Sequence, residues 1–194
     1  MVRKNNGFTV IELMIVIAVL AIGLALAIPS YLDIRNKRAV TNAAEQMARF
    51  LSVAQSESIK RNQALTVTIN NNGVYCAGVD LGTAACDCRT AASCVVPAGG
   101  GDTTSVDLEM VLSGATFEMI QAPVLLDAGG NSTSQVLFTF DPVRGILDGV
   151  NQTSGTVQFT SDNGNFALDV DMALTGRIEI CSRGSMKVGG FQGC

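Results

Sequence analysis

Residues 8–28 read FTVIELMIVIAVLAIGLALAI, and this stretch decides the architecture of the chain. As a helix, these residues would extend about 31 Å, which matches the roughly 30 Å hydrocarbon core of a bilayer. The basic residues Arg3 and Lys4 precede the stretch, and Glu12 is the one ionisable side chain inside it. The sequence therefore predicts a membrane-inserted helix close to the N-terminus.

Three interpretations fit an apolar stretch of this length. A cleaved signal peptide would explain the basic start and the small residues Ala25 and Ala27, and a plain membrane anchor would explain the length alone. The third interpretation is a helix that stays on the protein and packs against copies of itself. Glu12 favours the third, because a carboxylate in the membrane costs about 2.5–3.5 kcal/mol and is by default functional and paired. In a staggered helix bundle, the amine of a neighbouring chain can neutralise it.

Gly7, Phe8 and Glu12 resemble the prepilin peptidase motif of type IV pilins and type II secretion pseudopilins. The resemblance implies that residues 1–7 are a leader removed after Gly7, and that the new terminus Phe8 is N-methylated. It implies that residues 8–28 are a transmembrane and assembly helix, in which Glu12 meets the Phe8 amine of the next subunit. The expected partners are other pilin subunits, prepilin peptidase and an inner-membrane assembly platform.

The same resemblance implies a location. Before assembly the protein is expected in the bacterial inner membrane, with a single span and its head in the periplasm. After assembly it is expected in a pilus or pseudopilus.

The helix is expected to continue beyond the membrane span. Pro29 lacks one helical hydrogen bond and predicts a kink. Residues 29–62 keep a helical period, so they are predicted to form an amphipathic helix whose apolar stripe packs on a sheet. This stripe consists of Val40, Ala43, Met47, Phe50 and Ala54.

Residues 63–194 are predicted to form a β-rich globular head, because short apolar runs alternate with turn signals rich in Gly, Asn and Asp. Asn163-Gly164 predicts a hairpin with a two-residue turn. The predicted fold class is α+β, a long N-terminal helix packed on an antiparallel sheet, as in the type IV pilin fold. The expected strands are residues 65–69, 73–79, 106–112, 116–120, 135–140, 156–160, 166–171 and 177–181.

Six cysteines, none of them in the predicted helix, favour disulfides in an extracytoplasmic head. Cys181 and Cys194 are expected to pair, because they stand apart from the other four and a bridge would hold the Gly-rich tail. The sequence does not assign partners to Cys76, Cys86, Cys88 and Cys94. A Cys₄ zinc site is the alternative for these four, but their spacing lacks the usual close pairs. No metal or cofactor is expected, and residues 80–105 are expected to be a disulfide-held surface loop.

The composition argues against catalysis and against nucleic-acid binding. The chain has no histidine, which removes the commonest general base, and no nucleophile cluster stands out, so an enzyme is not expected. From residue 62 onward there are five basic and thirteen acidic side chains, a balance of −8 that repels phosphate. Asp169 and Asp171 lie on one face of a predicted half-buried strand, and a cation site is the alternative.

Residues 137–145 and 175–181 resemble the head of the FimT/GspH branch of minor pilins and minor pseudopilins. The implied function is a structural minor pilin that helps to initiate or cap a type IV pilus. The alternatives are a GspH-type minor pseudopilin of a type II secretion system and a pilus-associated DNA-uptake receptor. Members that take up DNA use a Gly-Arg-x-Arg motif, and here Glu179 replaces its second arginine. The candidate DNA contacts are Arg177, Arg183 and Lys187.

Overall fold

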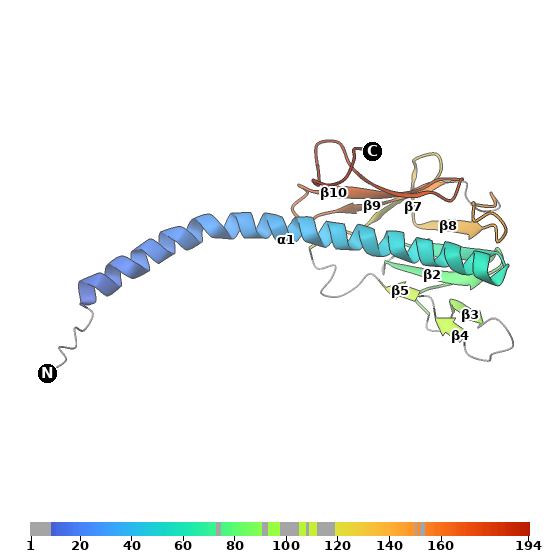
Figure 1. Cartoon of the computed structure of the whole chain (residues 1–194), viewed down its shortest axis with the longest axis horizontal. Helices are drawn as coiled ribbons and strands as arrows, with labels where there is room; N and C mark the ends of the chain where they lie inside the picture. Colours follow the sequence, from blue (N-terminus) through green and yellow to red (C-terminus); the bar gives the residue numbers. More distant parts are fainter. Residues whose placement is uncertain are drawn as a thin grey trace. The chain divides into compact units, whose positions relative to one another are not determined.

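A computed structural model describes residues 9–72, 75–90, 93–97, 105–107, 109–111, 119–149, 151 and 154–194 (Figure 1). The chain divides into two compact units, Met1–Arg35 and Asn36–Cys194. Helix α1, Val10–Arg61, begins in the first unit and ends in the second. The predicted leader, with Gly7 and Phe8, lies outside the described residues, as does most of the predicted strand at residues 116–120.

In the second unit, α1 packs on the head through one apolar face. The stripe follows the prediction with one correction: Phe50 is only half-buried, and Leu51 takes its place in the core. The buried side chains recur every three or four residues, as an apolar helix face requires. They are Val40, Ala43, Ala44, Met47, Leu51 and Ala54.

The end of α1 is fixed by local backbone chemistry. Asn62 has a positive φ of 53°, a left-handed conformation that asparagine tolerates better than most residues. Its N–H donates to the Ile59 carbonyl, and the Gln63 N–H donates to the Ser58 carbonyl, each at 3.2 Å. This is a Schellman cap, which satisfies carbonyls that the last helical turn leaves free. The Ser58 hydroxyl also reaches the Phe140 carbonyl at 3.2 Å and so joins the helix end to the head.

The head contains two larger sheets and one small one, and all described strand pairs are antiparallel, so the α+β prediction is confirmed. The first sheet has the order β5 (Glu109–Val111), β2 (Cys76–Leu81), β1 (Leu65–Asn70), β8 (Gln135–Phe140). The second has the order β11 (Ile178–Ser182), β10 (Ala167–Met172), β9 (Gly155–Thr160), β6 (Val124–Leu126), β7 (Ser132–Thr133). The third pairs β3 (Val95–Pro97) with β4 (Ser105–Asp107).

The structure corrects three details of the predicted head. The hairpin at Asn163-Gly164 has a loop longer than two residues, since the last register pair of β9 and β10 is Thr160 with Ala167. Within this loop the Asn163 side chain accepts from the Ser161 hydroxyl and from the Asn165 N–H. The expected loop at residues 80–105 contains strand β3 and the start of β4. Strands β6 and β7 were not predicted; in the turn between them, the Asp127 carboxylate accepts from Gly129 N and Asn131 N.

Strand β1 is buried on both faces, and each face has a different cover. Leu65, Val67 and Ile69 belong to the same hydrophobic core as the apolar stripe of α1. On the other face, the Thr68 hydroxyl accepts a hydrogen bond from the Cys86 N–H at 3.2 Å, and Asn70 Nδ2 lies 3.6 Å from Cys88 Sγ. The cysteine-rich segment that follows β2 therefore covers the outer face of the first sheet.

Candidate functional site

The described apolar side chains of α1 in the first unit are exposed. Of the described helices, α1 alone is long and apolar enough to cross a membrane, and none of its most apolar 18-residue stretch is buried. Val10 is 78% exposed and Leu20 is 58% exposed. Apolar side chains at such exposure require lipid or another protein surface around them. This exposure is what the predicted assembly helix requires, and its role in assembly stays a prediction.

Glu12 lies in the first turn of this helix, and Thr9 forms the helix N-cap. The Thr9 hydroxyl accepts a hydrogen bond from the Glu12 N–H at 3.3 Å, and the Thr9 carbonyl accepts from the Leu13 N–H at 3.2 Å. A threonine followed three residues later by glutamate is the sequence of a capping box, and a carboxylate in the first turn suits the helix dipole. Sequence reasoning missed Thr9, although this spacing was visible in the chain.

Two predicted features of the helix remain predictions. Gly7 and Phe8 lie outside the described residues, so the pairing of Glu12 with an amine is a proposal about the assembled state. Pro29 lies within α1, which continues through it to Arg61, and the kink expected at Pro29 stays a prediction.

The candidate DNA contacts do not form an open basic patch. Arg177 directly precedes β11 and makes an ion pair with Glu179, the residue that replaces the second arginine of the motif. Arg183 makes an ion pair with Asp169. Lys187 is exposed in the C-terminal tail. Two of these three cations face carboxylates, which offset part of their attraction for a phosphate backbone.

Asp169 and Asp171 are held by protein groups, and this accounts for them without a cation. Asp169 is 6% exposed and accepts from Arg183 Nε at 3.1 Å and from Gln158 Nε2 at 3.4 Å. Asp171 accepts from the Thr156 hydroxyl at 2.6 Å. The strand register explains both contacts, because Gln158 lies opposite Asp169 and Thr156 opposite Asp171.

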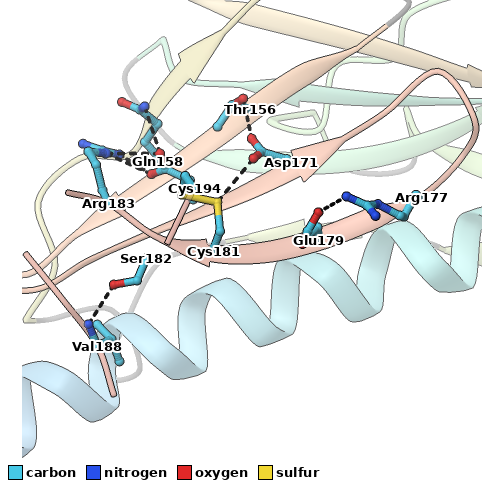
Figure 2. Close-up of a disulfide and its surroundings, with 11 residues drawn as sticks. Thr156, Gln158, Asp171, Arg177, Glu179, Cys181, Ser182, Arg183, Val188 and Cys194 are labelled. Atoms are coloured by element: carbon cyan, nitrogen blue, oxygen red, sulfur yellow. Dashed lines mark hydrogen bonds and ion pairs between the residues drawn. A yellow bond between two sulfur atoms is a disulfide. The ribbon is translucent and has the colours of Figure 1, made fainter. Parts of the chain in front are cut away.

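The C-terminal tail folds back along β11 and is fixed there by the disulfide between Cys181 and Cys194 (Figure 2). This is the pair that the sequence favoured. Ser182 supports the same arrangement: its N–H donates to the Gln192 carbonyl at 2.7 Å, and its hydroxyl accepts from the Val188 N–H at 2.8 Å. Cys181 Sγ lies 3.4 Å from Asp171 Oδ2. This contact is not a hydrogen bond, because a disulfide sulfur carries no proton.

The remaining cysteines form two further disulfides, Cys76–Cys88 and Cys86–Cys94. We call these four residues the cysteine cluster. All four are buried, and they contact one another beside β1 and β2. The zinc alternative is contradicted, because thiolates that are joined in disulfides are not available as metal ligands.

Gly176, which the sequence offered only as part of a degenerate DNA motif, has a packing role. It has a φ of +75°, and a Cβ there would lie 2.2 Å from the Gly145 carbonyl oxygen and 2.6 Å from Gln55 Nε2. Gln55, on α1, donates to the carbonyls of Gly145 at 2.5 Å and Gly176 at 3.0 Å. One helix amide therefore joins the loop after β8 to the turn between β10 and β11. Neither Gln55 nor this contact was predicted, since it connects segments far apart in the sequence.

Comparison with known families gives two matches. Residues 43–176 match the family of the type II transport protein GspH, which is more than half of the chain. Residues 2–28 match the prokaryotic N-terminal methylation motif. The second match covers the predicted leader and membrane helix.

Individual relatives are pilins. A fimbrial protein of Pseudomonas aeruginosa is 32% identical over 76 residues, which are 39% of this chain and 49% of the relative. The type IV major pilin protein PilA of Myxococcus xanthus is 32% identical over 111 residues, which are 54% of this chain and 50% of PilA. The chain thus spans about half the length of the curated relatives it matches. Among solved structures, the type IV minor pilin FimU of P. aeruginosa aligns with 78% of this chain and 93% of FimU, at 15% identity and a TM-score of 0.45.

Proposed function

The chain belongs to the GspH family of type II transport proteins, and from this membership we propose that it is a minor pilin that helps to initiate or cap a type IV pilus. As a type IV pilin-like minor pilin or pseudopilin it is a structural protein and not an enzyme. The observation that carries the proposal is the exposed apolar helix of the first unit, with one carboxylate near its start. Such a surface needs lipid before assembly and neighbouring helices after it.

Glu12 gives this helix a register in the proposed filament. After cleavage at Gly7, the Phe8 amine of one subunit would meet the Glu12 carboxylate of the next. A buried carboxylate and a buried amine neutralise each other only when both helices are correctly offset, so the pair penalises misaligned subunits. The same carboxylate suits the dipole at the start of its own helix, next to the Thr9 cap.

Three variants of the full chain test this proposal. Glu12→Ala and Glu12→Gln should leave membrane insertion intact and reduce incorporation into purified filaments at least tenfold, since a mismatch of 1.4 kcal/mol is already a factor of ten. Thr9→Val, which removes the cap hydroxyl and keeps the charge, should incorporate almost normally. Normal incorporation of Glu12→Gln, or equal losses for Thr9→Val and Glu12→Ala, would contradict the role of the charge.

The terminus of the mature protein is a second test. Mass spectrometry of filament or membrane fractions should find a chain that starts at N-methylated Phe8. A mature chain that starts after residue 27 would mean that signal peptidase removed the helix. In that case the chain could not polymerise through the helix, and the proposal would be wrong.

A minor pseudopilin of a type II secretion system is the second candidate, because the matched family is described by that system's GspH protein. Both candidates use the same helix, so they are distinguished in cells. Deletion of the gene should remove surface pili and leave secretion of extracellular enzymes unchanged if the protein serves the pilus. The opposite pattern would assign it to secretion. DNA uptake is the weaker candidate, because Arg177 and Arg183 are both paired with carboxylates.

A further inference from the structure

The two disulfides of the cysteine cluster interleave along the chain. The bridge Cys76–Cys88 encloses Cys86, and the bridge Cys86–Cys94 encloses Cys88. If the four cysteines paired two by two in the order in which they occur along the chain, the bridges would be 76–86 and 88–94. The native pattern therefore differs from consecutive pairing at all four positions. Cys181–Cys194, in contrast, joins two consecutive cysteines.

The wrong pairings are physically accessible, because the four cysteines gather at one place on the first sheet. Cys76 and Gly78 point to the same face of β2, since residues two apart in a strand share a face. A Cβ at Gly78 would lie 2.2 Å from Cys94 Sγ and 3.0 Å from Cys86 Sγ, so the second bridge packs directly on that glycine. A collapsed chain in which these segments meet brings all four thiols together before the final packing selects between them.

Once the head has folded, the two disulfides of the cysteine cluster are buried and cannot be rearranged by an external thiol. Cys76 and Cys94 are 0% exposed, Cys88 is 3% exposed and Cys86 is 5% exposed. A thiolate must reach a disulfide sulfur to exchange it, and buried sulfurs do not allow this approach. A mispaired cluster must therefore be corrected before the outer face of β1 is covered.

From these observations we infer that the head requires a thiol–disulfide isomerase as a folding partner, which acts on the cysteine cluster before assembly. The inference rests on the proposed function in one respect, namely that the head folds in an oxidising compartment after membrane insertion. A dithiol oxidase first forms the bridges: its own disulfide accepts the two electrons and two protons of each pair of cysteine thiols. The isomerase then rearranges consecutive bridges without any net oxidation or reduction.

The rearrangement balances in three exchanges. The isomerase thiolate attacks Cys76 of a 76–86 bridge, forms a mixed disulfide and releases the Cys86 thiolate. Cys86 attacks Cys94 of an 88–94 bridge, which forms Cys86–Cys94 and releases the Cys88 thiolate. Cys88 then attacks Cys76 in the mixed disulfide, which forms Cys76–Cys88 and returns the isomerase thiolate. Three S–S bonds form and three break.

Refolding of the full chain tests the inference. The reduced chain, unfolded in urea with detergent micelles, is diluted into a thioredoxin-fold dithiol oxidase with or without a disulfide isomerase. Proteolysis before Asp80 and Asp87 and after Arg89 separates all four cluster cysteines into different peptides, so mass spectrometry without reduction identifies each pairing. Four cysteines allow three pairings, so about a third of the molecules or fewer should be native with oxidase alone. The isomerase should raise this fraction about threefold.

Matched variants remove the interleaving and keep the rest. Cys86→Ser/Cys94→Ser and Cys76→Ser/Cys88→Ser each leave one cluster bridge, whose two cysteines are then consecutive, and both should reach their native pairing with oxidase alone. Cys181→Ser/Cys194→Ser keeps the interleaved pair and should still depend on the isomerase. If one of the two single-bridge variants does not fold, the other still provides the comparison.

Two outcomes would overturn the inference. One is a native cluster in most wild-type molecules with oxidase alone, because packing would then select the bridges unaided. The other is an equal isomerase effect in wild type and in both single-bridge variants, because the partner would then act on folding in general. None of these measurements depends on filament incorporation or on leader cleavage, so failure here leaves the proposed function standing. Failed incorporation of the chain into filaments would likewise leave the refolding result unchanged.

Discussion

Replacement of Gly176 by alanine tests the central junction of the head. Two effects combine at this position. The φ of +75° places an alanine in the left-handed region, which costs roughly 1–2 kcal/mol. The added Cβ would also lie 2.2 Å from the Gly145 carbonyl oxygen and 2.6 Å from Gln55 Nε2, so the turn must move away from α1.

The second effect can be given a magnitude from the hydrogen bonds at risk. Movement of the turn breaks or stretches the two bonds that Gln55 donates, to Gly145 and to Gly176. A net contribution of about 0.5–1.5 kcal/mol for each bond adds roughly 1–3 kcal/mol. Gly176→Ala should therefore lower the free energy of unfolding by about 2–5 kcal/mol in total.

Gly164 provides the matched control. It has a φ of +71°, and nothing lies within 4 Å of a Cβ built there. Gly164→Ala should show only the backbone effect of roughly 1–2 kcal/mol. In a chain of this size, an excess of about 1–3 kcal/mol for Gly176→Ala corresponds to a melting temperature roughly 2–12 °C below that of the control.

The assay is thermal unfolding of the full chain in detergent micelles with the disulfides intact, followed by circular dichroism. A third variant, Gln55→Ala, completes a double-mutant cycle with Gly176→Ala. The excess should shrink in this background, since part of the crowding and both hydrogen bonds are already absent. Equal melting temperatures for Gly176→Ala and Gly164→Ala would refute the crowding argument.

Three further predictions concern charge and covalent links in the head. Arg183→Ala should lower the free energy of unfolding by about 3 kcal/mol, because it leaves the buried Asp169 carboxylate without its cation, whereas exposed Lys187→Ala should change it by less than about 0.5 kcal/mol. Cys181→Ser/Cys194→Ser should lower the free energy of unfolding by about 3 kcal/mol in the same melting assay. It should also make the C-terminal tail sensitive to protease, and an unchanged digestion pattern would count against a tethering role of the disulfide. The Arg144 and Val143 N–H groups hold the pKa of Asp141 below its ordinary value, and the Asn131 N–H does the same for Asp127. Because the pKa of each carboxyl is lower in the folded than in the unfolded chain, its ionised form stabilises the fold above about pH 4, and this contribution is lost as the pH falls through the folded pKa. The melting temperature of Asp141→Asn, which lacks one of these carboxylates, should therefore decline less steeply in acid than that of the wild type.

The sequence was most informative where the physics is local. The apolar length of residues 8–28 and the misplaced charge of Glu12 can be recognised without knowledge of any contact. The α1 stripe was predictable for the same reason, because a helix repeats its buried positions every three or four residues. Phe50 was misplaced because the apolar neighbours Phe50 and Leu51 are one residue apart, and periodicity alone does not choose between them.

Contacts across the head could not be predicted in this way. The pair Asp169–Arg183 depends on how the chain turns after β11, and the amide of Gln55 bonds to residues about 90 and 121 positions away. The cysteine cluster is the clearest case, since the order of its four cysteines along the chain does not choose between the possible pairings. Only the position of each cysteine on the outer face of β1 and β2 selects the native pairing.

The two units differ in what stabilises them. The head is stabilised within one molecule, by its own core and by three disulfides, so its stability does not depend on concentration. The described apolar side chains of the first unit are exposed. If other subunits cover them as we propose, their burial follows mass action. Thiol exchange needs accessible sulfurs, and the folded head alone already buries the four cysteines of the cluster. If the chain polymerises as we propose, the interleaved bridges should therefore form while the head folds, before the subunit is assembled.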